Sequence, residues 1–330
     1  NVAIGNSALG ALNHTTQTNA FNTAVGYSAG AAVTTGIQNT LFGTFAGDAL
    51  TDADENVAVG LSALTTDTLG NGSTAIGYQA LNTQNFTTAT ATNNVAVGYN
   101  AGVTVTTGVN NTIIGAFAGD ALTDADHNTA VGRASLSQDT LGSRSTALGF
   151  QALSVQNFTT ATEAYNTAVG FNAGVSVSTG LNNTLIGALA GDALTTGDHN
   201  VIIGIASASA AVGTDNQIVI GNTAVGVGAN NFTFGNGSTD SNIAFGATTI
   251  TAPSDQRYKE DIADATAGLA FIKDLRPVTF KWRKEKDVPS DHLSYVEGSD
   301  KRVMNDYTNH GFIAQEVKTA IDAHSEIKDG

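Results

Sequence analysis

Acidic side chains recur at matching positions in the first half of the sequence, with a spacing that could bind a cation. Converging carboxylate oxygens are typical ligands of Ca²⁺. The two copies lie 72 residues apart and consist of Asp48, Asp52 and Asp54, and of Asp120, Asp124 and Asp126. A third copy holds Thr196 and Gly197 in place of the matching Asp and Ala, which breaks the ligand set. We therefore favour solvated turns over Ca²⁺ sites at these positions.

Histidines also occupy matching positions, since His127 and His199 each precede a recurrent asparagine. One imidazole per turn, with no other strong ligand at zinc-like spacing, indicates a hydrogen-bonded turn residue rather than a metal ligand. The chain contains no cysteine, which excludes thiolate metal sites, cysteine nucleophiles and disulfides. Acids in repeated turns also differ from the carboxylate pair that glycoside hydrolysis needs. We expect no metal and no cofactor, and we disfavour a polysaccharide-cleaving enzyme.

Charge is divided unevenly along the chain. Only two of its 14 Lys and Arg, Arg133 and Arg144, precede residue 254, whereas 14 of its 29 Asp and Glu do, so the first 253 residues carry a net charge of −12. An acidic segment of this kind repels phosphate backbones, which argues against nucleic acid as a partner. No stretch approaches the roughly 20 apolar residues of a membrane span. We therefore expect no membrane insertion.

A motif of the form Asn-x-Ala-Val-Gly organises the first two thirds of the chain. Its glycines are separated by 21, 17, 17 and 17 residues, and the same steps then return, so four units form a super-repeat of 72 residues. Residues 45–54 accordingly return as residues 117–126. The glycines are Gly5, Gly26, Gly43, Gly60, Gly77, Gly98, Gly115, Gly132, Gly149, Gly170, Gly187, Gly204 and Gly221.

Each unit combines a short apolar alternation, such as Val95 and Val97 before Gly98, with small residues and a Thr, Gly and Asp-rich turn. This pattern indicates one or two short strands per unit and disfavours helices. Seventeen residues cannot bury a core alone, but rungs stacked about 4.8 Å apart can. We therefore predict a mainly β fold with a parallel β-solenoid or β-roll over residues 1–225. The recurrent Asn suits an amide ladder, the Gly a positive φ or close approach, and the Ala a narrow interior.

The repeats also resemble a known family. Asn-x-Val-Ala-Val-Gly, followed by Ser or Asn-Ala-Gly or by Ala-Leu, is similar to the head repeats of trimeric autotransporter adhesins, although the present units are longer. Similar repeats occur in phage fibre proteins. The resemblance implies a left-handed parallel β-roll in a threefold bundle. A homotrimer is therefore expected from the resemblance.

Beyond Gly221 the period breaks down. Residues 231–235 and 242–246 predict irregular short strands with aromatic side chains, and we assign residues 226–253 to a neck or cap. A charged region follows, with helical periodicity around Ile262, Leu269, Phe271 and Ile272 and a strand-like segment over residues 278–282. The sequence therefore predicts a small α+β segment over residues 254–330.

Three ordered blocks in this last segment carry a second resemblance. They are Ser254-Asp-x-Arg257-x-Lys259, residues 275–282 (Leu-Arg-Pro-Val-Thr-Phe-Lys-Trp) and residues 311–317 (Gly-Phe-Ile-Ala-Gln-Glu-Val). In that order they resemble the intramolecular chaperone domain of phage endosialidases, tailspikes and L-shaped tail fibres. A related domain occurs in a membrane-bound transcription factor of animals. The family domain continues into long C-terminal helices, so we expect the present chain to be part of a longer protein.

The resemblance implies a single-turnover self-cleavage, which makes enzyme activity uncertain beyond that one event. In the family, a Ser and a Lys five residues later break the peptide bond before the Ser once the trimer has folded. Carried over, these residues are Ser254 and Lys259, and the bond joins Pro253 to Ser254. Lys259 needs a depressed pKa, for which burial and the neighbouring Arg257 are available causes. Asp255 and Arg257 match motif positions and are expected to orient the pair.

The spacing alone supports this chemistry weakly. Five residues place two side chains about 140° apart on an ideal helix and on opposite faces of a strand. A turn or a neighbouring protomer must therefore bring Ser254 and Lys259 together. The alternative for Ser254 is a helix N-cap before the charged segment.

Together these features predict a virion protein of the tail fibre or tailspike type. We expect it to bind a host cell-surface receptor, possibly a glycan, and other virion tail proteins, while its C-terminal chaperone assists trimerisation and cleaves itself off. The alternative is the head of a bacterial trimeric surface adhesin, located at the cell surface. Fold resemblance supports the architecture more than the function.

Overall fold

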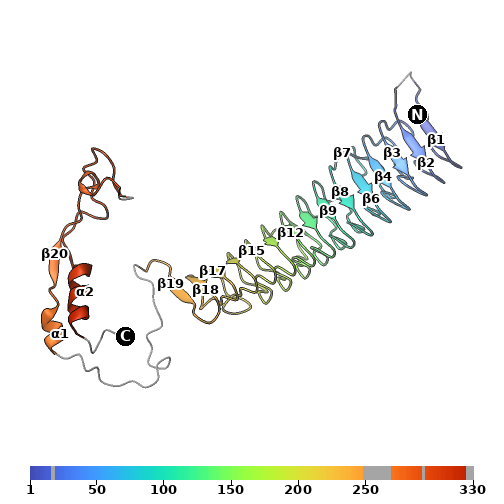
Figure 1. The fold of residues 1–330 in the computed structure, drawn as a ribbon. Coiled ribbons are helices and arrows are strands. Elements are labelled where there is room, and N and C mark those ends of the chain that lie inside the picture. Colours follow the sequence, from blue (N-terminus) through green and yellow to red (C-terminus); the bar gives the residue numbers. More distant parts are fainter. Residues whose placement is uncertain (16–18, 248–268, 292–293, 325–330) are drawn as a thin grey trace. The chain divides into compact units, whose positions relative to one another are not determined.

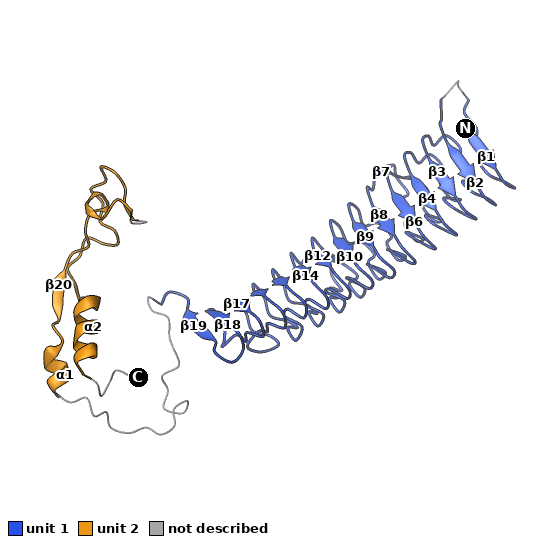
Figure 2. Cartoon of the chain, viewed as in Figure 1, with its two compact units in different colours: residues 1–253 blue, residues 254–330 orange. Residues whose placement is uncertain are grey.

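The computed structural model describes residues 1–15, 19–247, 269–291 and 294–324. The chain divides into two compact units, residues 1–253 and residues 254–330 (Figure 2). Among the described residues, no helix has the length and apolar character needed to cross a membrane.

One sheet of 15 short strands runs the length of the first unit, with its strands stacked in succession (Figure 1). Most strands have three residues, because each rung contributes only its Thr-Ala-Val-like segment before the glycine turn. The strands are β1 (Val2–Ile4), β2 (Thr23–Val25), β3 (Thr40–Phe42), β4 (Val57–Val59), β6 (Thr74–Ile76), β8 (Val95–Val97), β9 (Thr112–Ile114), β10 (Thr129–Val131), β12 (Thr146–Leu148), β14 (Thr167–Val169), β15 (Thr184–Ile186), β16 (Val201–Ile203), β17 (Gln217–Gly221), β18 (Asn231–Gly235) and β19 (Ser241–Ala244).

Neighbouring strands from β1 to β18 are parallel, and matching repeat positions lie opposite one another. In β9 and β10, for example, Thr112 pairs with Thr129 and Ile113 with Ala130. The predicted parallel β-solenoid is therefore confirmed. The stacking continues one strand past Gly221, since β17 and β18 pair in register, and β19 then returns antiparallel to β18.

The longer, 21-residue steps add a second small ladder outside the main sheet. β5 (Gly70–Asn71) pairs with β7 (Thr90–Ala91), and β11 (Gly142–Ser143) pairs with β13 (Thr162–Glu163), both in parallel. Because the extra residues form their own pairing at one corner, the main strands on either side keep their register. The 72-residue super-repeat thus appears in three dimensions as a protrusion on every fourth rung.

The interior of the solenoid is narrow and filled by small and branched side chains. The central residue of each three-residue strand from β2 onward points inward and is buried, and Ala occupies this position in most rungs. The largest fully buried apolar side chains are Leu41, Leu50, Leu64, Leu81, Ile113, Leu122, Leu136, Leu153, Leu185, Leu194 and Ile202. One continuous core therefore runs through all rungs, as stacking requires.

The recurrent asparagines form a buried ladder along the rod. Asn111 is fully buried, its Nδ2 donates to the carbonyl of Ala125 at 2.7 Å, and its Oδ1 accepts from the backbone N–H of Asn128 at 2.9 Å. Asn39, Asn94 and Asn183 make the corresponding bonds in their own rungs. Each Asn thus closes its own rung and receives the next one, which explains why the residue recurs.

The glycine that ends each strand allows successive rungs to approach closely. Gly149 has a φ of 141°, which disfavours other residues, and a Cβ placed there would lie 2.2 Å from the carbonyl oxygen of Gly170. Both roles predicted for this glycine, a positive φ and a close approach of backbones, are therefore present at one position.

The second unit has a different composition of elements. Helix α1 (Leu269–Asp274) precedes strand β20 (Val278–Phe280), a short 3₁₀ helix η2 (Glu285–Asp287), strand β21 (Asn309–Gly311) and helix α2 (Ala314–Ala323). Strands β20 and β21 pair antiparallel, with Val278 opposite Gly311 and Phe280 opposite Asn309. The described part of this unit is therefore α+β, as predicted.

Candidate functional site

The predicted cleavage site lies outside the described residues. Pro253, Ser254, Asp255, Arg257 and Lys259 all fall within residues 248–268. The roles assigned to them from the family resemblance therefore remain predictions. The geometry of the second and third sequence blocks is described, and it shows how far these blocks come together.

Strands β20 and β21 bring the second and third blocks into direct contact. The β20 residues lie in the Leu275–Trp282 block and Gly311 opens the third block, so the antiparallel pairing joins segments more than 30 residues apart in sequence. Helix α2 continues directly from the third block. Two blocks recognised only by their order in the sequence thus form one local structure.

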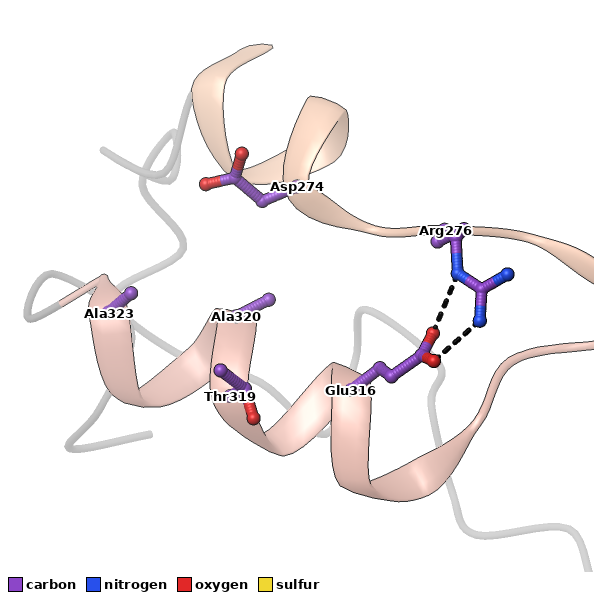
Figure 3. A pocket seen from close by; sticks show the side chains of 6 residues that line it. All are labelled: Asp274, Arg276, Glu316, Thr319, Ala320 and Ala323. Atoms are coloured by element: carbon purple, nitrogen blue, oxygen red, sulfur yellow. Dashed lines mark hydrogen bonds and ion pairs between the residues drawn. The ribbon is translucent and has the colours of Figure 1, made fainter.

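A bidentate ion pair links the same two blocks beside the strands (Figure 3). Nε of Arg276 donates to Oε2 of Glu316 at 3.0 Å, and Nη2 donates to Oε1 at 2.5 Å. The hydrogen bonds from Arg276 lower the pKa of the Glu316 carboxyl below its ordinary value, and the same bonds raise the pKa of the guanidinium. Both side chains are substantially exposed, so solvent and salt screen the pair.

A recess of about 460 Å³ lies next to this ion pair. Figure 3 shows its lining side chains, which are Asp274, Arg276, Glu316, Thr319, Ala320 and Ala323. The hydroxyl of Thr319 donates to the carbonyl of Gln315 at 2.9 Å, and Asp274 accepts from or donates to the ring of His324 at 2.9 Å. The lining therefore offers no hydroxyl paired with a base, and its contacts hold α1 and α2 together rather than perform peptide cleavage.

Further ion pairs order the segment between β20 and β21. Lys284 and Lys286 both reach Asp300 at 2.6 Å, and their hydrogen bonds lower the pKa of Asp300 to about 2. Nη1 of Arg302 donates to the carbonyl of Trp282 at 2.5 Å, and the rings of Phe280 and Trp282 meet edge to face with centroids 5.3 Å apart. These are exposed, charge-rich contacts of a kind not found in the solenoid core.

The acidic turns of the solenoid bond mostly to the preceding rung. Oδ1 of Asp54 accepts from the N–H of Ile37 at 2.8 Å, and Oδ1 of Asp126 accepts from the N–H of Val109 at 2.7 Å. Asp124 accepts from the hydroxyl of Thr107 at 2.7 Å. Oδ1 of Asp120 is buried without a partner among the described residues, and burial raises the pKa of this carboxyl. Across those residues, no group of three or more His, Asp and Glu converges as metal ligands would.

His127 and His199 occupy left-handed turn positions, with φ values of 60° and 59°. Nε2 of His127 lies 3.5 Å from Nδ2 of Asn110 in the preceding rung. These histidines thus stand in one column with the residue that precedes each rung asparagine. That position accounts for their recurrence.

Sequence reasoning missed a cluster around Arg144, which it treated only as an isolated positive charge. Nε of Arg144 donates to Oε1 of Glu163 at 2.9 Å, and the hydroxyl of Tyr165 donates to Oε2 of the same carboxylate at 2.6 Å. Residue-by-residue comparison of the first two super-repeats would have identified it, because the matching residues Gly72, Ala91 and Asn93 cannot form these bonds.

Two exposed apolar columns, which we call the apolar columns, flank the rung glycines. The first consists of the residues immediately before them, whose exposed members include Ile4, Phe42, Ile76, Ile114, Leu148, Ile186 and Ile220. The second consists of large side chains one or two positions after them, with exposed members Tyr27, Phe45, Leu61, Tyr78, Tyr99, Phe171 and Ile205. Rings in this second column stack between rungs, as in Tyr78 and Tyr99 at 5.0 Å and in Phe150 and Phe171 at 5.3 Å.

Comparison with known proteins assigns the C-terminal segment. Residues 254–325 match the family model described as the chaperone of endosialidase. The match begins at Ser254 and spans all three sequence blocks, which confirms the resemblance inferred from their order. No curated protein and no solved structure matches the chain.

Proposed function

We propose that this chain is the distal part of a viral tail fibre or tailspike, in which three solenoid rods associate and the C-terminal segment acts as an intramolecular chaperone. The family match of residues 254–325 carries the proposal. It favours a virion protein over the alternative adhesin head. The solenoid supports the same function, because a stacked rod of this kind extends roughly 60 Å over 13 strand-to-strand steps and holds its far end away from an attachment point.

Both units support trimerisation through exposed apolar surface. The apolar columns run along the rod without a buried partner, and contiguous apolar surface of this extent marks interaction sites. In the C-terminal unit, Ala320 is the single buried apolar side chain among the described residues, whereas Met304, Tyr307 and Phe312 are more than half exposed. A unit with so little core of its own gains stability from packing against other copies.

Sedimentation analysis of the intact chain tests the assembly. We expect a species of roughly 100 kDa, three times the 33.5 kDa chain. Phe42→Ser and Ile114→Ser together place hydroxyls in the first apolar column and should shift the species toward monomer. The control is Thr40→Ser with Thr112→Ser, which alters the other outward position of the same strands. A stable folded monomer of the unaltered chain would contradict the proposal.

The proposed maturation step is a self-cleavage between Pro253 and Ser254. Oγ of Ser254 attacks the carbonyl carbon of Pro253, Lys259 accepts the hydroxyl proton, and the C–N bond breaks as its nitrogen is protonated. The resulting ester joins Pro253 to Oγ of Ser254, and water hydrolyses it to a Pro253 carboxylate and a free Ser254 amine. Asp255 and Arg257 orient the pair in this mechanism.

Mass spectrometry of the chain, expressed with its native flanking sequence, tests the cleavage. Ser254→Ala should abolish cutting while trimers still form, because the change removes only the nucleophile. Lys259→Ala should slow cutting by a factor on the order of 10² to 10⁴, which is the usual contribution of a general base. Equal intact masses for the unaltered chain and Ser254→Ala, with both trimeric, would show a chaperone without protease activity and leave Ser254 as a helix N-cap.

The distal position of the rod also suggests a receptor-binding role. We include binding to a host cell-surface receptor and to other virion tail proteins in the proposed function, with the virion as its location. The acidic rod favours partners that carry little negative charge, since like charges repel at long range.

A further inference from the structure

The first two super-repeats, residues 22–93 and 94–165, differ in chemistry mainly at one place on the surface. Most differences between them exchange residues of similar size or polarity. The changes that introduce charge or an aromatic ring near the long turn are Glu55 to His127, Gly72 to Arg144, Ala91 to Glu163 and Asn93 to Tyr165. One further charge change, Leu61 to Arg133, lies at the opposite end of the strand in the second apolar column.

All four changed residues converge on one recess, which we call the corner recess. It has a volume of about 300 Å³ and is lined by Asp124, Asp126, His127, Ser143, Arg144, Ala161, Thr162 and Glu163. Tyr165 joins it through its bond to Glu163, and the guanidinium of Arg144 lies over the Tyr165 ring, 5.9 Å from its centroid. Four side chains from three rungs therefore form one polar group with an aromatic member.

The scaffold beneath the corner recess is the same in both super-repeats. Oγ of Ser143 accepts from the N–H of Asp126 at 2.9 Å, and Oδ1 of Asn71 accepts from the N–H of Asp54 at 2.8 Å. The backbone conformation is also preserved, since φ is 62° at Glu55 and 60° at His127, and 50° at both Asn93 and Tyr165. The fold does not require the four changed side chains, because the first super-repeat stacks without them.

The residues of the corner recess suit a neutral ligand that is rich in hydroxyl groups. Three carboxylates, on Asp124, Asp126 and Glu163, outnumber the one guanidinium, so an anionic ligand meets net repulsion. Carboxylates accept hydrogen bonds from hydroxyls, while Arg144 and His127 provide donors. The ring of Tyr165 is about half exposed and offers a flat apolar surface to the C–H face of a sugar. The volume lies at the lower end of the range of about 300 to 1,000 Å³ typical of small-molecule sites.

We propose that the corner recess binds a neutral saccharide unit of a host-surface glycan. The proposal rests on the receptor-binding role within the proposed function. The recess stays accessible when the rods associate through the apolar columns, because the two features lie at opposite ends of the strand. About five residues of extended chain separate Arg144 from the rung glycine Gly149, a distance of roughly 16 Å.

Binding is measured by saturation-transfer NMR on the intact chain. The probes are the methyl glycosides of glucose, galactose, mannose and N-acetylglucosamine at millimolar concentrations, with the anionic sugar N-acetylneuraminic acid for comparison. We expect at least one neutral glycoside to bind. The variant with His127→Glu, Arg144→Gly, Glu163→Ala and Tyr165→Asn restores the residues of the first super-repeat and should weaken this binding at least tenfold.

A gain-of-function variant provides the matched control. Glu55→His, Gly72→Arg, Ala91→Glu and Asn93→Tyr build a second corner recess on the first super-repeat, and the shared backbone conformation allows them. The number of saccharides bound per chain should rise from one to two. No binding of any neutral glycoside, binding that survives the restoring variant, or tighter binding of N-acetylneuraminic acid at the recess would each overturn the proposal.

Adsorption of the same proteins to a panel of bacterial cells separates the two levels of inference. If the unaltered chain and the restoring variant adsorb equally, the receptor role stands and the corner recess is not its site. If the unaltered chain adsorbs to no cell type, the receptor role fails. Glycoside binding at the recess, decided by NMR, then shows whether the recess still recognises a saccharide.

Discussion

The solenoid and the C-terminal unit keep their structures by different physical means. In the solenoid, every rung repeats the same buried Asn, inward Ala and close Gly, and many of these side chains have no exposed surface at all. In the C-terminal unit, one buried alanine is accompanied by exposed ion pairs and aromatic contacts among the described residues. The first design distributes stability over many equivalent buried contacts, whereas the second depends on a few contacts open to solvent.

The difference fits the two roles that we propose. A rod that must persist outside a host cell gains from contacts that neither salt nor pH can reach. A chaperone that acts during assembly and is then released needs only enough stability to bring its own segments and its copies together. The comparison therefore predicts large, salt-independent effects for changes in the solenoid core and small, salt-dependent effects in the C-terminal unit.

The largest effect is expected where a rung glycine is replaced. Gly149→Ala forces a side chain into a φ of 141° and places its Cβ 2.2 Å from the carbonyl oxygen of Gly170, so two rungs must separate. We expect a loss of more than about 3 kcal/mol in the free energy of unfolding, measured by denaturant titration with far-UV circular dichroism.

Gly228→Ala is the control for this change. Gly228 has a φ of 153°, but no atom lies within 4 Å of the position its Cβ would take, so this change adds strain without a clash. It should cost about 1 to 3 kcal/mol at most. Equal effects of the two changes would mean that rung contact adds nothing to backbone strain, and the close-packed account of the solenoid would fail.

A smaller but still large effect is expected for the asparagine ladder. Asn111→Ala leaves the carbonyl of Ala125 and the N–H of Asn128 buried without their side-chain partner. We expect a loss of about 2 to 4 kcal/mol, unchanged between low and high salt. The neighbouring Asn110 is exposed and has a φ of 59°, so Asn110→Gly should change stability by less than about 0.5 kcal/mol. A strong salt dependence of the Asn111→Ala effect would contradict the buried-ladder explanation.

The two regions also differ in how much of them the sequence could predict. The glycine period predicted the strand register because each rung repeats one local environment, so a single solution applies to every copy. The ladder of Asn94, Asn111 and Asn128 followed from the same argument. The pairing of Arg276 with Glu316 could not be predicted, since 40 residues separate them and only the folded chain brings them together.

The corner recess was missed for a related reason. Attention to what repeats hides what departs from the repeat, and Arg144, Glu163 and Tyr165 are departures. Their contacts cross a rung boundary, as in the pair formed by Arg144 and Glu163, which are 19 residues apart. Such contacts become visible in a sequence only after the rung length is known and equivalent positions are aligned.

The smallest effect is expected for the ion pair that joins the second and third blocks. Glu316→Gln removes the negative charge while keeping an oxygen acceptor for Arg276. Because both partners are exposed, we expect a slight decrease in the thermal stability of the C-terminal unit at low salt and none at high salt. Fluorescence of Trp282, the single tryptophan of the chain, reports on this unit alone.

The pH dependence gives the sign of this contribution. Arg276 holds the pKa of Glu316 below its ordinary value, so the stabilisation is fully present above the ordinary carboxyl pKa of about 4.3 and is lost as the pH falls through the lower folded-state pKa. The unaltered chain should therefore lose stability in that acidic window more steeply than Glu316→Gln. The control is Asp322→Asn, which removes an exposed pair with Lys318 inside helix α2. If the two variants behave alike, the pair of Arg276 and Glu316 contributes no more than a surface pair within one helix, and the pairing of β20 with β21 alone holds the blocks together.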